Sequence, residues 1–408
     1  MVSKWKGAIF TLKANDYSII KAANRTLIYN TLLTKGPMSV MELLYETRLS
    51  RPTVENTLRD MSADGLIEKA GIARLSVGRS AQLYQIGTQA LFAMGVDLEF
   101  PDIRLAVLNL QGERQYIDIW RCNSDMTAEH VISDLIDHMR KASAQVLGDE
   151  PDKRRLIGIG VGIGGLLDLS RGISLSHERI NGWENIALPE ILKNEFGVHV
   201  TMRNDVHMLA FIHRAARIKR GISNYCYISM RSGIGMVSYI KGDMYAGMMG
   251  NAGFFGHTTV DFNGPKCHCG SRGCLEGYLK DSYLTAQYAL LTGEMISYEQ
   301  LLSRCQKGEP QAEQIISSAY HLLGKAVSNV IKIMDIQNVV FNGLPQAAQE
   351  KMLVWVREGI LECLDERIGS CLNISAESLT EEEKPMGAAL LMLQRFIKTP
   401  KLNLTPSA

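Results

Sequence analysis

The sequence predicts two parts of different fold class: a small helical segment that ends in a β-hairpin, and a larger α/β body. Helical spacing of apolar residues dominates the first 90 residues, and strands alternate with helices after them. The charge changes at the same place. Residues 1–90 contain 12 Lys and Arg against 7 Asp and Glu, a net charge of +5, and the remainder carries −4. This asymmetry is typical of a chain in which only the first part meets nucleic acid.

Length and composition set the broad class. A chain of 408 residues is long for one core, which predicts two or three domains. No window approaches the roughly 20 apolar residues of a membrane helix, and the first residues lack the apolar core and cleavage site of a signal peptide. We therefore expect a cytoplasmic protein with no membrane segment.

Three helices are expected in the first part. The first begins at Asp16 or Ser18 and stops at Gly36-Pro37, while Ser39 and Ser50 can cap the second and third. Pro52 falls in the first turn of the third helix, where its missing N–H costs little. The apolar positions are Ile20, Leu27, Ile28 and Leu32 in the first helix, Val40, Leu43 and Leu44 in the second, and Val54, Leu58 and Met61 in the third.

Two short strands, around 67–75 and 81–86, follow these helices. Three helices and a hairpin form the plan of a winged helix-turn-helix, which we assign to residues 1–86. The third helix of such a domain reads base edges, and hairpin cations meet phosphates or the minor groove. The expected DNA contacts are Arg51, Thr53, Asn56 and Arg59 on the helix, and Arg74 and Arg79 on the hairpin. The alternatives are ordinary solvated faces or a domain that contacts only protein.

The second part, residues 87–398, reads as one α/β body, with a tail at 399–408. Two strand–turn–strand units, at 93–112 and 224–245, indicate two related lobes. Strands are expected at 92–98, 103–110, 156–163, 224–230, 235–242 and 338–343, and helices at 127–147, 187–196, 206–220, 275–292, 309–335, 346–364 and 385–398.

A group of one histidine and three cysteines predicts a metal site: His257, Cys267, Cys269 and Cys274. One imidazole and three thiolates complete a tetrahedral structural zinc site, one ion per chain, with no open position for a reactive water. The alternatives are a disulfide, free reduced thiols, or His268 in place of His257 as the fourth ligand. The other five cysteines stand far apart, and we expect them to be reduced and buried.

The stretch from Gly233 to Leu279 resembles the signature of the ROK family of repressors, open reading frames and kinases. The match comprises Gly253-x-x-Gly256-His257, followed by Cys-x-Cys-Gly-x-x-Gly-Cys-x-Glu. The similarity runs from about residue 90 to 395, and it takes in residues 158–168, Trp183, Asn204-Asp205 and residues 341–343. The winged helix is what the repressor branch of this family carries and its plain kinases lack.

The resemblance implies an actin-like, two-lobed sugar-kinase fold with a sugar in the cleft between the lobes. It assigns Asn204, Asp205 and Glu276 to hydrogen bonds with sugar hydroxyls, and His257 to the edge of the cleft. In the kinases the matching aspartate is the general base, which makes Asp205 a vestigial base if phosphate transfer is lost.

Two departures from the family pattern bear on activity. The kinases have an Asp-x-Gly-Gly-Thr turn that cradles phosphate, and here Asp97 is followed by Leu98, Glu99, Phe100 and Pro101. Without these glycines we expect that the turn does not bind phosphate and that the protein has no kinase activity. We therefore expect that it is not an enzyme. The second departure is Phe254, which replaces a glutamate that contacts sugar. Phe254 either stacks on the ligand or fills the pocket.

These features predict a transcriptional regulator of carbohydrate uptake or metabolism, acting as a repressor on operator DNA. The effector is a sugar or sugar phosphate, and a homodimer or higher homo-oligomer places two heads on a palindromic operator. Effector binding in the cleft is expected to shift the closure of the lobes, and we expect the zinc loop to transmit this shift to the DNA-binding heads. The alternatives are a regulator controlled by a protein partner with Phe254 closing the pocket, an active sugar kinase, and activation in place of repression.

Overall fold

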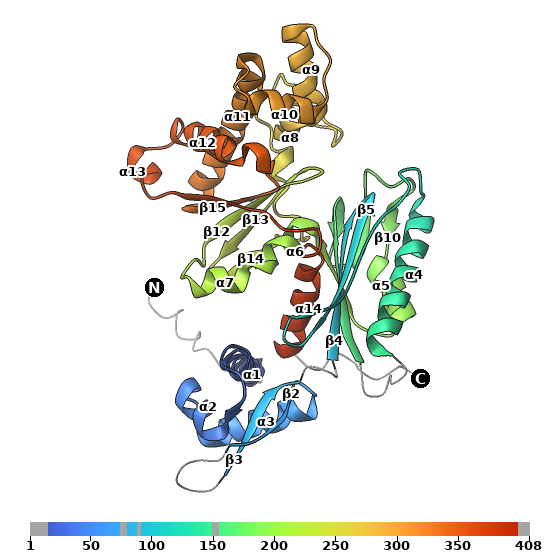
Figure 1. Cartoon of the computed structure of the whole chain (residues 1–408), viewed down its shortest axis with the longest axis vertical. Helices are drawn as coiled ribbons and strands as arrows, with labels where there is room; N and C mark the ends of the chain where they lie inside the picture. Colours follow the sequence, from blue (N-terminus) through green and yellow to red (C-terminus); the bar gives the residue numbers. More distant parts are fainter. Residues whose placement is uncertain (1–14, 74–79, 88–90, 149–154, 399–408) are drawn as a thin grey trace, which may run out of the picture.

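The computed structural model describes residues 15–73, 80–87, 91–148 and 155–398. A small head lies at the lower end, and two lobes that each contain a sheet lie above it (Figure 1). Among the helices within these ranges, none is long and apolar enough to cross a membrane.

The head has the predicted winged-helix plan. Helices α1 (Asn15–Lys35), α2 (Val40–Thr47) and α3 (Arg51–Ala63) precede the hairpin strands β2 (Ile67–Ala73) and β3 (Ala81–Ile86), and β1 (Met38–Ser39) pairs with β3. The Ser39 and Ser50 hydroxyls accept hydrogen bonds from Glu42 N and Thr53 N, so both predicted caps are present. They satisfy amides that the first turn of a helix leaves free.

The predicted apolar positions of α1 are only partly correct. Ile28 and Leu32 are buried against α3 and the hairpin, but Ile20 and Leu27 are 58% and 42% exposed. At about 100° per residue, Ile20 and Leu27 are turned well away from Ile28 on the helix. In α2 and α3 the predicted positions do face the core.

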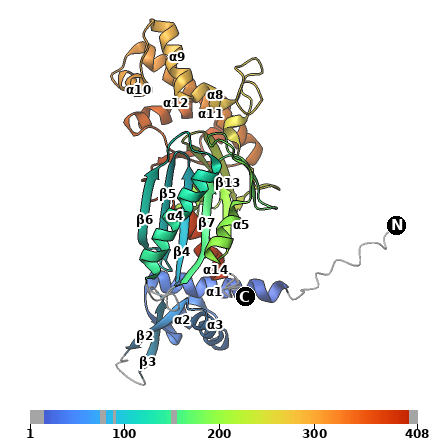
Figure 2. The ribbon, with the colours of Figure 1, turned by 90° about the vertical axis from the view of Figure 1, so that its right-hand side faces the viewer.

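Lobe 1 is built on a five-stranded sheet in the order β11-β7-β4-β5-β6. Its strands are β4 (Leu91–Glu99), β5 (Asp102–Asn109), β6 (Arg114–Arg121), β7 (Arg155–Ile163) and β11 (Val200–Asn204). Helices α4 (Ala128–Leu147) and α5 (Leu188–Phe196) cover one face (Figure 2), and α6 (Asp205–Ile212) and α14 (Met386–Lys398) pack on the other. A small sheet of β8 (Leu166–Asp168), β9 (Ile173–Ser176) and β10 (Glu184–Ile186) extends this lobe.

Lobe 2 repeats the strand order of lobe 1. Its sheet runs β14-β13-β12-β15-β16, with the first three strands antiparallel and the last two parallel, as in lobe 1. The expectation of two related lobes therefore holds at the level of topology. The strands are β12 (Tyr225–Met230), β13 (Ile234–Ile240), β14 (Asp243–Tyr245), β15 (Asn338–Asn342) and β16 (Asn373–Glu377).

The remaining helices belong to lobe 2. Two of the helices predicted from the sequence, at 206–220 and 275–292, are each split in two. The break at His213 separates α6 from α7 (Arg214–Lys219), and extended Lys280 separates α8 (Leu275–Leu279) from α9 (Asp281–Thr292). Helix α10 (Tyr298–Gln306), which was not predicted, precedes α11 (Pro310–Met334), α12 (Gln349–Leu361) and α13 (Glu366–Gly369).

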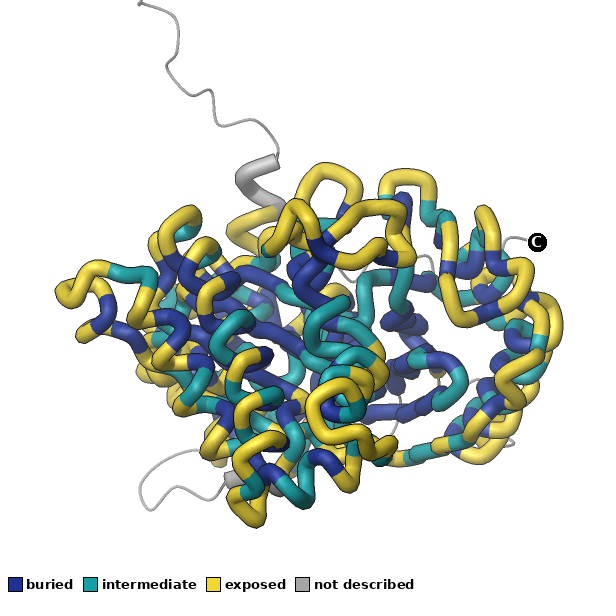
Figure 3. The backbone as a smooth tube through the Cα atoms, turned by 90° about the horizontal axis from the view of Figure 1, so that it is seen from above, coloured by how far each residue is buried: buried dark blue, intermediate teal, exposed yellow. Residues whose placement is uncertain are grey.

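Buried segments run through the interior of both lobes (Figure 3), and each lobe has its own apolar core. A third core joins the head to lobe 1. It contains Ile28 and Val54 of the head together with Leu91, Met392 and Phe396 of the body. The assignment of residues 1–86 and 87–398 to two domains stays a prediction, and the two parts share this core.

Candidate metal centre, cleft and nucleic-acid interface

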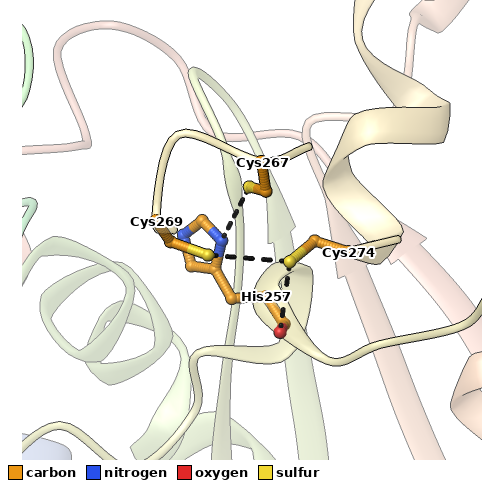
Figure 4. Close-up of side chains that lie close together, drawn as sticks. All are labelled: His257, Cys267, Cys269 and Cys274. Carbon is orange, nitrogen blue, oxygen red and sulfur yellow. Dashed lines mark hydrogen bonds between the residues drawn. The ribbon is translucent and has the colours of Figure 1, made fainter. Parts of the chain in front are cut away.

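The four predicted metal ligands lie together at the edge of lobe 2 (Figure 4). His257 ends the short 3-10 helix η1 (Phe255–His257), Cys267 and Cys269 lie in the following loop, and Cys274 caps α8. Cys267 Sγ is 3.7 Å from His257 Nδ1, and Cys269 Sγ is 3.6 Å from Cys274 Sγ. A tetrahedral ion with Zn–S bonds of about 2.3 Å separates its ligand atoms by about 3.8 Å. The donor set and its spacing therefore suit a metal ion.

The loop that carries these ligands is held in a shape that only glycine permits at Gly273. Gly273 has a φ of +63°, and a Cβ there would lie 1.6 Å from the carbonyl oxygen of Asp261. Its amide donates to Pro265 O, and its carbonyl accepts from Val260 N. The backbone thus forms the ligand geometry with its own hydrogen bonds.

His268, the alternative fourth ligand, points across to lobe 1. Its Nε2 lies 2.7 Å from Glu178 Oε2, and its Nδ1 lies 3.1 Å from Lys280 Nζ. His257 is the histidine that lies with all three thiols, within 4.8 Å of each. The loop therefore reaches lobe 1 through the contact between His268 and Glu178, both of which line the cavity described next.

A cavity of about 520 Å³ lies between the lobes, within the usual range for small-molecule sites. Lobe 1 contributes the turn after β7 and the loop after β9, and lobe 2 contributes the β12–β13 turn and the segment before η1. All five predicted effector residues line this cavity: Asn204, Asp205, Phe254, His257 and Glu276.

Asn204 and Asp205 stand at the start of α6, where β11 ends. The Asn204 side chain accepts a hydrogen bond from Val206 N, which fixes the turn into the helix. The Asp205 side chain is 14% exposed, and one of its oxygens lies 3.7 Å from Arg231. Burial raises the pKa of Asp205, although the Arg231 guanidinium opposes the rise. Asp205 remains a good acceptor for a ligand hydroxyl.

Glu276 already has two partners within lobe 2. One carboxylate oxygen accepts from Ile234 N at 3.1 Å, and the other lies 3.3 Å from Lys280 Nζ. Glu276 therefore holds the β13 turn as well as lining the cleft. Its other lone pairs are available to a ligand.

Phe254 lines the cleft without filling it. The side chain is 38% exposed and lies edge-on to the His257 ring at a centroid distance of 6.1 Å. The cavity of about 520 Å³ includes Phe254 in its wall. This arrangement provides an apolar face beside the polar groups.

Ion pairs occupy the position of the expected phosphate turn. Arg231, from the β12–β13 turn, binds Asp97 at 2.7 Å and also binds Glu99. Arg104 contacts both carboxylates at 3.1 Å and pairs with Glu381. Phe100, which follows Glu99 in the chain, is buried. Lobe 1 is thereby tied to lobe 2 through buried charges.

The electrostatics of Asp97 follow from these contacts. Burial alone raises the pKa of Asp97, but the charges of Arg231 and Arg104 outweigh burial and hold it below its usual value. Sequence reasoning missed Arg231. The signal was an acidic residue, Glu99, at the end of a buried strand, because a buried carboxylate needs a cation.

The recognition helix α3 presents its predicted residues to solvent. Arg51, Asn56 and Arg59 are exposed, and Thr53 is half-buried with its hydroxyl 2.7 Å from Ser50 Oγ. Arg51 also pairs with Glu55 at 2.9 Å, and the Arg51 side chain is 68% exposed. Arg74 and Arg79 lie outside the described residues.

The ROK family matches residues 93–395. The chain belongs to the ROK family. It is 24% identical over 386 residues to the xylose repressor of Bacillus subtilis, covering 94% of this chain and 98% of the repressor. It is also 24% identical over 377 residues to the DNA-binding transcriptional dual regulator NagC of Escherichia coli, covering 88% and 87%.

Solved structures place the head and body in the same family fold. A ROK family transcriptional regulator, a homologue of the E. coli MLC protein, aligns with a TM-score of 0.79 at 23% identity, covering 93% of this chain and 97% of its own. The ROK hexokinase of Thermus thermophilus aligns with a TM-score of 0.61 at 24% identity, covering 73% and 97%. The body thus has the actin-like sugar-kinase fold, and the regulator matches more of this chain than the kinase does.

Proposed function

We propose that the protein is a sugar-responsive transcriptional repressor that binds operator DNA through its head and a sugar or sugar phosphate in its cleft. The supporting observation is that one chain combines a winged helix with a ROK cleft that keeps its polar groups. The names of the relatives, xylose repressor and N-acetylglucosamine repressor, agree with this function.

The proposal includes one structural zinc ion per chain, held by His257, Cys267, Cys269 and Cys274. It also includes a homodimer or higher homo-oligomer, which matches two heads to a palindromic operator. A protein that acts on operator DNA works in the cytoplasm.

The proposal assigns no kinase activity to the chain. Phosphate transfer depends on backbone amides and cations that cradle the phosphoryl group. Asp97 and Glu99 put negative charge where that group belongs, and Arg231 is already paired with them. Asp205 is then a hydrogen-bonding residue of the effector site, without a role as a base.

DNA binding is tested by fluorescence anisotropy with the intergenic DNA upstream of the gene. We expect salt-sensitive, sequence-specific binding, because phosphate contacts release counterions. Arg59→Ala is expected to weaken it by about 1–3 kcal/mol, or roughly 5- to 150-fold. The control is Lys193→Ala, which removes an exposed cation from α5 and is expected to leave affinity within about twofold. Binding that ignores both sequence and salt would contradict the proposal.

Effector binding is tested by thermal shift with D-xylose, D-glucose, N-acetyl-D-glucosamine and the 6-phosphates of the two hexoses. One of these sugars is expected to raise the melting temperature and weaken operator binding, since a ligand stabilises the state that it binds. Asp205→Ala should abolish the shift, and Asp137→Ala on the exposed face of α4 should preserve it. If no sugar binds, control by a protein partner is favoured. Release of ADP when ATP is added together with any of these sugars would favour the alternative of an active kinase.

A further inference from the structure

We propose that Arg25 is a positioning residue that couples the cleft to the recognition helix through α14. The path runs from Asp205 along α6 to α14, and from the end of α14 through Arg25 to α3. The inference rests on the proposed function, because it names how a change in the cleft reaches the DNA-binding surface.

At the cleft end, α6 and α14 are in backbone contact. Asp205 is the first residue of α6, and a Cβ added to Gly387 of α14 would lie 1.9 Å from the carbonyl oxygen of Met208. On its other side α14 sits equally close to the lobe 1 sheet, since a Cβ at Gly95 or Gly160 would meet α14 or its flanking residue at 2.2 Å. Because there is no free space between the two helices, a movement of α6 towards α14 must displace α14.

At the head end, α14 finishes inside the core that it shares with the winged helix. Phe396 and Ile397 are buried there together with Ile28 of α1. The Arg25 side chain is 1% exposed, and its Nε donates to the carbonyl oxygen of Ile397 at 3.3 Å. A cation next to the last carbonyls of a helix is favourable.

The same guanidinium holds the end of the recognition helix. Arg25 NH1 lies 2.7 Å from Oδ2 of Asp64, the residue that ends α3. A buried cation that loses one partner is costly, so both contacts of Arg25 constrain its position. The end of α14 and the end of α3 are consequently tied to one rigid group.

Two comparisons single out this path. Lys21 also joins α1 to α3, through Asp60, but its side chain is 48% exposed and the contact stays within the head. Helix α8, which directly follows the loop of Cys267 and Cys269, lies in the upper part of the molecule, away from the head (Figures 1 and 2). The path through α6 and α14, in contrast, is a contact at each step from the cleft to the head.

The test is hydrogen–deuterium exchange of the full-length, zinc-loaded protein, without any sugar or DNA. In Arg25→Met, exchange should rise about tenfold or more in the last turn of α14 and in the first turn of α6, as well as in α3. In Lys21→Met, the change should stay within α1 and α3. Exchange in α14 and α6 that is unchanged in Arg25→Met would overturn the proposal.

A second variant approaches the path from its other end, and it decides the question if Arg25→Met unfolds the head. Gly387→Ala forces α6 away from α14, and we expect exchange in α1 and at the end of α3 to rise about fivefold or more. The control is Gly369→Ala in α13, whose Cβ would lie 2.6 Å from a Leu361 side chain. A Gly387→Ala effect confined to α6 and α14 would contradict the coupling.

The proposed function is measured separately from this coupling. For a panel sugar that weakens operator binding, the ratio of dissociation constants with and without sugar should fall at least about fivefold in Arg25→Met. A ratio that stays at its wild-type value would overturn the proposal even if exchange changes. Failure of the protein to bind operator or sugar would remove the proposed function and leave the exchange result intact.

Discussion

The two lobes share one strand order, yet their edges at the cleft have opposite character. Lobe 2 faces the cleft with a loop fixed by glycine turns and a cluster of one imidazole and three thiols. Where lobe 1 meets lobe 2 beside the cleft, Asp97 is buried and Glu99 is half-buried, and their charges are neutralised by Arg231 and Arg104. One fold repeated in two lobes therefore carries a buried ion-pair network on one lobe and a Cys/His cluster on the other.

The two edges also differ in what stabilises them. A metal cluster stabilises its loop directly, because the ligands gain binding energy as the loop folds. A buried ion-pair network gains little over apolar packing, but it is strongly destabilised when one partner is removed. Perturbing each edge separately therefore distinguishes the two roles.

The largest expected effect is loss of the zinc ion proposed for lobe 2. Cys269→Ser should leave less than half of the zinc content of the wild type and lower the free energy of unfolding by about 5 kcal/mol or more. Mass spectrometry of bound metal and urea unfolding measure the two quantities. Cys371→Ser is the control and should change neither quantity. The expectation that the five other cysteines are buried is wrong for Cys371, which is exposed, and for Cys363, which is half-buried. Full stability of Cys269→Ser would show that the loop needs no metal.

The next effect breaks the network of lobe 1. Arg231→Met leaves Asp97 and Glu99 with Arg104 alone, and we expect unfolding free energy to fall by about 3–5 kcal/mol. The matched control is Arg121→Met, which removes an ion pair with Asp102 whose side chains are 71% and 36% exposed. That pair should contribute about 1 kcal/mol or less. Equal losses in the two variants would mean that the buried network has no special role.

A third prediction concerns acid. Burial lowers the pKa of His177, on the cleft side of lobe 1, and that of His207, in α6, to about 4 each. An unfolded histidine titrates near 6.5, so between these values the unfolded chain binds more protons. The contribution of the two neutral histidines to the free energy of unfolding is therefore complete above pH 6.5. It is lost as the pH falls towards 4, by about 3 kcal/mol for each residue.

Urea unfolding at a series of pH values measures this loss. His207→Gln should remove about half of the dependence attributed to the pair. His130→Gln, at an exposed position, should leave the dependence as it is. A slope that is identical in the wild type and His207→Gln would contradict a buried neutral imidazole at position 207.

The smallest expected effect comes from a variant that tests whether Glu99 alone prevents nucleotide binding at residues 97–101. Glu99→Gly restores a glycine to the turn, but Pro101, Phe100 and the Asp97–Arg231 pair remain. We expect a loss of about 1–2 kcal/mol in stability from the missing charged contact, and no gain of ATP binding. Saturable ATP binding by this variant would mean that Glu99 alone blocks the nucleotide.

The sequence was most informative where function depends on neighbours along the chain. The spacing of Cys267, Cys269 and Cys274 predicted ligands that the structure brings together, and Ser39 and Ser50 marked helix starts correctly. The alternation of strands and helices predicted the α/β class of the body, and the resemblance to the ROK family implied its two-lobed fold.

Contacts between distant residues were not predictable in this way. Arg231 and Glu99 are 132 residues apart, and Arg25 and Ile397 are 372 apart. Helical spacing separates Ile20 and Leu27 from Ile28 around α1, but which of these sides meets the core depends on the rest of the fold. Such pairings depend on how lobes and head pack, which periodicity within one segment does not encode.

The proposed function requires a cleft that binds a sugar and does not bind a nucleotide phosphate. Isothermal titration calorimetry of the zinc-loaded protein tests it, with the panel sugars added first and magnesium ATP added second. We expect saturable heat for a sugar, loss of that heat in Asp205→Ala, and no heat for ATP with or without the sugar. Saturable ATP binding accompanied by ADP formation would contradict it.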